Sequence, residues 1–145
     1  MNATEIILKF LTFLSQVRAM FRQVHLFAEQ NPALREVSTM VIPFKGKPSD
    51  YADEGVTISI ALNAELCKPI NSERKAIGIS LLLRHAGGEW LAEAEVGWTG
   101  ENVGWDPFDS KEARAESIEE IISLVPSLVE WMDARFREEV AKLLK

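Results

Sequence analysis

Few residues of this chain have the types that catalysis or metal binding requires. Its candidates for a nucleophile and a base are the single cysteine, Cys67, and two histidines, His25 and His85. Nothing in the spacing brings Cys67 to either histidine, so we interpret Cys67 as a small hydrophobic residue rather than a nucleophile. A single cysteine also excludes an intramolecular disulfide and a Cys/His zinc set.

Paired carboxylates are the other candidate chemistry. Glu93 and Glu95 lie two residues apart in EWLAEAEVGW, which places both on one strand face, where a general acid and a base would flank a substrate. Alternatively, acids on an exposed strand prevent edge-to-edge aggregation. Because no third group is visible to separate their pKa values, the sequence favours the second interpretation. It predicts no catalytic residue, no metal site and no cofactor.

The stretch EVGWTGENVGWDPFDS, residues 95–110, is rich in glycine, tryptophan and acids. Its GxxGxxxG spacing differs from that of phosphate-binding loops, and its acids would repel a polyanion. We predict a stiff connector with a short strand at residues 103–105 and an extended exit through Asp106-Pro107. Trp98 is predicted in the core, whereas Trp105 beside Asp106 has the composition of an interface anchor.

Acidic residues are concentrated in one part of the chain. The net charge is −6, but residues 89–130 contain eleven acids and two bases. This segment carries −9 and leaves +3 for the rest of the chain. Such a distribution repels phosphate backbones and favours either a basic partner or solubility alone. Direct binding of nucleic acid is therefore not expected.

The N-terminal part is predicted to form one long amphipathic helix. Apolar residues recur at steps of three and four from Ile6 to Phe27, and Pro32 ends the helix. The apolar stripe is wide, which favours packing on a sheet and leaves both a monomer and a helix-mediated homodimer open. Glu5, Lys9 and Arg18 argue against a signal peptide and a membrane span, so we expect a cytoplasmic protein without membrane contact.

Alternating apolar residues predict strands in the middle of the chain. Residues 56–66, 76–85 and 89–98 each alternate, and the glycines of residues 85–88 suit a hairpin turn. These strands are expected to form an antiparallel meander with one buried and one solvated face. Residues 34–44 fit either a strand or a short helix, with the strand favoured, and residues 45–55 are predicted to form a polar loop.

The C-terminal part is predicted to be helical. Asp109 or Ser110 is a candidate cap, Ser117 and Glu120 form a capping box, and Pro126 is expected to kink the helix or split it in two. Residues 1–145 are therefore predicted to form a single α+β domain. It has a long N-terminal helix, a three- to four-stranded antiparallel sheet and one or two C-terminal helices, with the helices covering one face of the sheet.

Over about residues 56–132, the chain resembles small cytoplasmic immunity proteins of bacterial polymorphic-toxin and contact-dependent growth-inhibition systems. A strand, the hairpin GISLLLRHAGGEWLAEAEVGW, the connector GWDPFDS and the helix SIEEIISLV carry this resemblance. It implies a non-enzymatic protein that binds and neutralises the toxic C-terminal domain, often a nuclease, of a cognate effector. With the charge distribution, it predicts a basic toxin domain as partner. The contact residues expected from position and charge are Glu93, Glu95, Glu101, Trp105, Asp106 and Asp109.

Two other classes of function stay open beside this one. The wide apolar stripe of the first helix suits an acidic secretion chaperone that holds an unfolded segment. The acidic face of residues 89–98, with His85 nearby, suits a small-molecule binder or an enzyme. We expect the immunity function.

Overall fold

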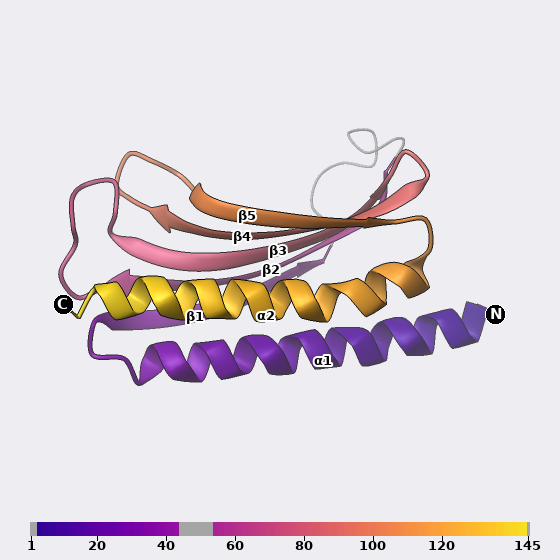
Figure 1. The fold of residues 1–145 in the computed structure, drawn as a ribbon, viewed down its shortest axis with the longest axis horizontal. Helices are drawn as coiled ribbons and strands as arrows, with labels where there is room; N and C mark the ends of the chain where they lie inside the picture. Colours follow the sequence, from indigo (N-terminus) through magenta and orange to yellow (C-terminus); the bar gives the residue numbers. More distant parts are fainter. Residues whose placement is uncertain (1–2, 44–53, 145) are drawn as a thin grey trace.

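The computed structural model of the protein describes residues 3–43 and 54–144. The elements follow in the order α1 (Ala3–Glu29), β1 (Leu34–Pro43), β2 (Glu54–Leu66), β3 (Ala76–Ala86), β4 (Glu89–Thr99), β5 (Asp106–Ala115) and α2 (Ile118–Lys142). The strands form one antiparallel sheet in chain order, from β1 to β5. Both helices lie on the same face of this sheet (Figure 1). The predicted loop at residues 45–55 falls largely outside the described residues.

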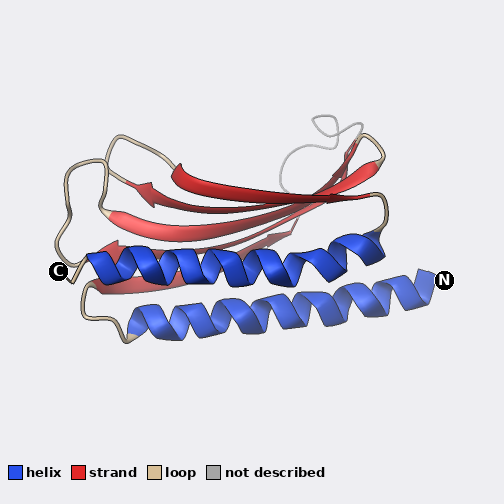
Figure 2. Cartoon of the chain, in the orientation of Figure 1, coloured by secondary structure: helices blue, strands red, loops and turns tan. Residues whose placement is uncertain are grey.

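The strand register explains the apolar alternation. One cross-strand row joins Val41, Ile60, Leu81, Ala94 and Lys111, and all five residues face the helices. Successive side chains of a strand point to opposite faces, so every second residue of β2, β3 and β4 is buried under the helices. The other face of the sheet carries no helix (Figure 2).

The hydrophobic core lies between the sheet and the two helices. α1 packs on β1 and β2, whereas α2 packs on β3, β4, β5 and α1. The largest fully buried side chains include Phe21, Leu62, Leu66, Ile77, Ile79, Ile121, Met132 and Phe136. Full burial of each such side chain contributes about 1.5–3 kcal/mol. Among the described residues, neither helix has a stretch long and apolar enough to cross a membrane.

Several predictions of local structure are confirmed. The α+β class, the long first helix, the three-strand meander and the strand at residues 34–43 are all present. Gly87 and Gly88 form the turn between β3 and β4 with φ values of 61° and 82°, a region that glycine adopts without steric cost. Trp98 is buried in the core, as expected.

The prediction of three to four strands was wrong, because the sheet has five. Residues 103–105 are not a strand, and Asp109 and Ser110 do not cap a helix but lie inside β5. β5 is an edge strand that exposes most of its side chains, so it lacks the apolar alternation that reveals a buried strand. Residues 106–115 are a strand because their backbone pairs with β4, which their composition does not indicate.

The C-terminal helix is a single element that continues through Pro126. It begins where the capping box predicts, since the Ser117 side chain accepts a hydrogen bond from the Glu120 amide. Of the two expected alternatives, one C-terminal helix or two, the structure has one. Buried residues before and after the proline, including Val125 and Val129, lie on the same sheet-facing side and hold both halves against the core.

Candidate partner-binding face of the sheet

The sheet face opposite the helices, called here the open face, is lined mainly by small and polar residues. The register places on it Ser38 and Met40 of β1, Ser59, Ala61 and Asn63 of β2, Gly78, Ser80, Leu82 and Arg84 of β3, Leu91, Glu93, Glu95 and Gly97 of β4, and Ser110, Glu112 and Arg114 of β5. Most of these residues are half-buried or exposed, and only Gly78, Leu91 and Gly97 are buried. The open face therefore consists largely of backbone and short side chains, with a few longer side chains between them.

Trp105 lies across one end of the open face. Its indole N–H donates to Glu95 Oε1 over 3.2 Å. A Cβ atom built on Gly78 would lie 3.4 Å from the indole Cζ3, so the ring rests against the Gly78 backbone. Gly78 is paired with Gly97 on β4, and this glycine pair leaves room for the ring. Trp105 stays 37% exposed, which leaves much of its surface available for contact.

Acidic side chains surround a shallow depression of about 200 Å³ between β4 and β5, lined by Glu93, Glu95, Ser110, Lys111 and Glu112. Glu93 and Glu112 are direct cross-strand partners, an arrangement in which like charges repel. Placing both at one depression makes it favourable for a cation.

Two arginines neutralise part of this acidic charge. Arg84 Nη2 lies 3.6 Å from Glu93 Oε1. Arg114 binds Glu89 over 2.7 Å and Glu112 over 3.3 Å, and these hydrogen bonds raise the pKa of Arg114 above its ordinary value. Glu95 differs, because within residues 3–43 and 54–144 it forms no ion pair and is held by the Trp105 indole. Among the described acids of this face, the Glu95 carboxylate is therefore the one whose charge is not neutralised by an arginine or lysine.

Asp109 lies on the helix-covered face instead. Its Oδ2 accepts from Arg135 Nε of α2 over 3.0 Å. Arg135 also donates to Glu139 over 2.9 Å and lies 4.8 Å above the ring of Phe108. The hydrogen bond from Arg135 to Glu139 is the main reason that the pKa of Arg135 is raised. Asp109 therefore connects β5 to α2, a structural role.

Glu101 and Asp106 lie at the end of the sheet where Trp105 begins to cross it. Glu101 forms an ion pair of 3.1 Å with Lys75, and its amide donates to the Ser72 carbonyl over 2.8 Å. Asp106 begins β5 and is exposed. The structure thus brings together only Glu93, Glu95 and Trp105 of the six predicted contact residues.

Sequence reasoning missed four members of the face, Arg84, Ser110, Glu112 and Arg114. Three of them occupy alternate positions of β5, which the sequence interpretation had placed at the start of a helix. The alternation of Ser110, Glu112 and Arg114 was the available signal. It was hidden because an edge strand carries polar residues on both of its faces.

The alternative catalytic set is not assembled by the fold. His85 faces the helix side and contacts the Trp90 ring at 5.0 Å, whereas Glu93 lies on the open face. Among the described residues, no group of three His, Cys, Asp or Glu side chains is arranged to hold a metal ion.

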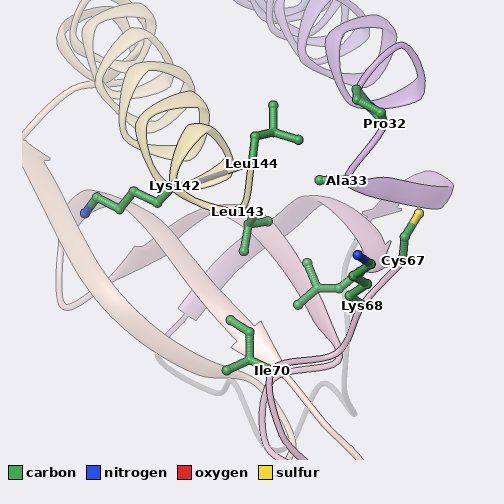
Figure 3. A pocket seen from close by; sticks show the side chains of 9 residues that line it. Pro32, Ala33, Cys67, Lys68, Ile70, Lys142, Leu143 and Leu144 are labelled. Atoms are coloured by element: carbon green, nitrogen blue, oxygen red, sulfur yellow. The ribbon is translucent and has the colours of Figure 1, made fainter.

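A larger cavity, of about 470 Å³, lies where α2 ends, against the loop after β2 (Figure 3). Its lining includes Ile70, Leu143 and Cys67, and Cys67 is exposed rather than packed as a small hydrophobic residue. Figure 3 shows Lys142 extending away from Cys67, and Lys142 Nζ donates to Glu139 over 3.2 Å. No histidine lines this cavity, so it offers Cys67 no imidazole base.

No family model matches the chain, and comparisons with curated proteins and with solved structures likewise give no match. The open face and the resemblance carried by the β3–β4 hairpin, the connector and the helix are therefore the two features that bear on function.

Proposed function

We propose that this protein is an immunity protein that binds the toxic C-terminal domain of a cognate bacterial effector through the open face of β3, β4 and β5. The observation that carries the proposal is the pairing of a half-exposed Trp105 with Glu95, an acid without an ion-pair partner in the described residues. A tryptophan beside an uncompensated carboxylate combines the apolar anchor and the charge that binding hot spots use.

The surroundings of Trp105 support this role. Trp105 is held by a hydrogen bond and by the glycine backbone beneath it, so little side-chain entropy is lost when a partner covers it. Glu93 and Glu112, each partly neutralised by an arginine, add a smaller negative contribution along the face. Such a potential steers a basic surface during encounter and raises the association rate more than the affinity. In this proposal the protein acts in the cytoplasm, where Cys67 remains reduced.

The test is a calorimetric titration with an inactivated C-terminal domain of the effector encoded immediately upstream. We expect one-to-one binding with nanomolar affinity, a binding free energy of about −12 kcal/mol. The affinity should fall as salt is added, because exposed charges are screened. Absence of binding would refute this pairing.

The location of the interface is tested with two variants and a control. Replacing a buried aromatic anchor typically costs about 2 kcal/mol or more, so Trp105→Ala should weaken binding by roughly thirtyfold. Glu95→Gln should slow association and reduce the salt dependence. Glu138→Gln removes the same charge from the exposed side of α2 and should bind like the wild type. If Trp105→Ala also binds like the wild type, the open face is not the interface.

A further inference from the structure

The opposite edge of the sheet is formed by β1 and is chemically different. Within the described residues, β1 pairs with β2 on one side only. A bulge lies between Arg35 and Ser38, with Glu36 at a φ of 47°. Beyond the bulge, residues 38–42 pair regularly with β2 and contain no charged residue. The β1 edge therefore presents a short row of backbone donors and acceptors to an added strand.

The β5 edge is protected in the way that sheet edges usually are. It carries Pro107 and a run of charged residues, Asp109, Lys111, Glu112 and Arg114. Proline and charged side chains prevent another strand from pairing. The bulge of β1 is another such device, but residues 38–42 beyond it carry neither proline nor charge, so this stretch is less protected than the β5 edge.

A groove of about 440 Å³ runs between α1 and β1, beside this edge. Its apolar lining comes from Phe21, Val41 and Ile60, together with Leu26, which is 40% exposed. Thr39 Oγ1 and His25 Nδ1 lie 2.7 Å apart and connect the strand to the helix across the groove. Side chains of a strand added to β1 would alternate between this groove and the open face beside Met40, which is 58% exposed.

The groove is basic, in contrast to the β4–β5 side of the molecule. Arg18 and Arg22 line it from successive turns of α1, and neither has an acidic partner among the described residues. The acid in the groove, Glu29, is already engaged with His25. An acidic side chain that enters the groove would therefore meet two uncompensated guanidinium groups.

From the less protected edge and the basic groove, we propose that β1 binds an extended acidic segment of a partner protein by strand addition. Main-chain hydrogen bonds to residues 38–42 supply affinity, and every second side chain is acidic and enters the α1–β1 groove. The intervening side chains are apolar and cover Met40. This surface touches the open face only at β1, away from the β3–β5 part proposed to bind the toxin domain, so the two proposals stand or fail independently.

A second copy of this chain is a poorer occupant of the same edge. Antiparallel pairing of two β1 strands would bring α1 and its symmetry mate together, with Arg18 and Arg22 of both copies near each other. Like charges at such an interface oppose association. Charge complementarity therefore favours an acidic segment over a dimer.

The experiment uses a fluorescein-labelled, capped peptide of about eight residues in which valine and glutamate alternate, a length typical of one strand. Binding to the full chain is followed by fluorescence anisotropy, with a valine–lysine peptide as control. The glutamate peptide should bind at least roughly tenfold more tightly than the lysine peptide. Equal affinity for the two, or no binding at about millimolar concentration, would overturn the proposal.

Charge reversal tests the groove directly. Arg18→Glu combined with Arg22→Glu should weaken the glutamate peptide at least roughly tenfold and strengthen the lysine peptide. Both side chains are exposed, so folding should be preserved, and urea unfolding of each variant checks this. Lys68→Glu is the control, since it reverses a charge outside the groove. If Lys68→Glu weakens binding of the glutamate peptide as much as the single variant Arg22→Glu does, the groove is not the site.

Two N-methylated peptides test whether the main chain pairs with β1. In an added strand, the N–H groups of alternate residues point toward β1 and the others point away. Methylation at one set of positions should abolish binding, and methylation at the other set should preserve it. Equal effects of the two methylations would contradict strand addition. Dimers of the protein alone, detected by sedimentation velocity, that exclude the peptide would show that a second copy occupies the edge and would overturn the proposal.

Discussion

At the residue scale, Arg135 of α2 connects several elements through its guanidinium group. It joins Asp109 of β5 to Glu139 one helical turn away, and it covers the Phe108 ring. A guanidinium group fits this position because its fork of donors serves two carboxylates while its plane stacks on an aromatic ring. This contact fixes α2 against β5 and so supports the open face from behind.

Glu139 makes this contact dependent on pH. Burial raises the pKa of Glu139, but hydrogen bonds from Arg135 and Lys142 outweigh this effect, and the pKa lies below its ordinary value. A carboxyl with a depressed pKa in the folded state contributes stability that is present above its unfolded pKa and is lost as the pH falls through the folded value. Between about pH 6 and about pH 3, the free energy of unfolding should therefore fall more for the wild type than for Glu139→Gln.

Urea unfolding at the two pH values measures this difference. Glu138→Gln is the matched control, because Glu138 is exposed on the same helix and should keep the full pH dependence of the wild type. A Glu139→Gln variant whose stability fell as steeply as that of the wild type would show that the hydrogen bonds from Arg135 and Lys142 contribute little.

The candidate site could be predicted only in part from single residues. Trp105 and Glu95 were identified from composition and position, and the structure brings them within hydrogen-bonding distance. Asp109 has the same local composition but lies on the other face of the sheet. The difference arises from the irregular register between Val96 and Gly97, which changes the pairing of β4 with β5. Such a bulge shifts the face on which a side chain lies and leaves no pattern in the sequence.

At the element scale, strands with one buried face could be predicted from the sequence, and the exposed edge strand could not. β2, β3 and β4 alternate clearly because one face of each lies under the helices, whereas β5 at the edge does not. The start of α2 could be predicted because a cap is a local interaction within one turn. Whether it continues past Pro126 or splits there was left open by the sequence, because continuity depends on packing of both halves against the same sheet.

Pro126 should reduce the stability of α2. A proline inside a helix lacks the amide that would bond to the preceding turn, and its ring crowds that turn. Pro126→Ala is expected to raise the free energy of unfolding by about 1–3 kcal/mol, measured by urea denaturation. Ser127→Ala changes an exposed neighbour and should alter stability by less than about 1 kcal/mol. A decrease in stability in Pro126→Ala would show that contacts of the proline ring outweigh the missing hydrogen bond.

At the scale of the whole molecule, charge is divided between the two edges of one sheet. The net negative charge of residues 89–130 includes β4 and β5, and the basic groove lies between α1 and β1. Since β2 and β3 intervene, the order of the strands separates these two surfaces. Each surface is suited to a partner that the other would repel.

This separation predicts how the two surfaces influence each other. Adjacent strands lie about 4.8 Å apart, so β1 and β4, the strand that carries Glu95, are separated by roughly 14 Å. That exceeds the Debye length of about 8 Å at about 0.15 M salt but not the length of about 30 Å at about 0.01 M. Glu95→Gln should therefore leave the affinity of the valine–glutamate peptide unchanged at the higher salt concentration. At the lower concentration it should raise that affinity, because one negative charge is removed.

Anisotropy titrations of the peptide at both salt concentrations measure this coupling. Glu138→Gln is the control for the loss of one charge elsewhere on the molecule. A change in peptide affinity that is equal at both salt concentrations would mean that the edges communicate through the structure of the sheet. A purely electrostatic effect of Glu95 on the α1–β1 groove should disappear at the higher salt concentration, because salt screens the field between them. An effect that persists there requires coupling through packed residues.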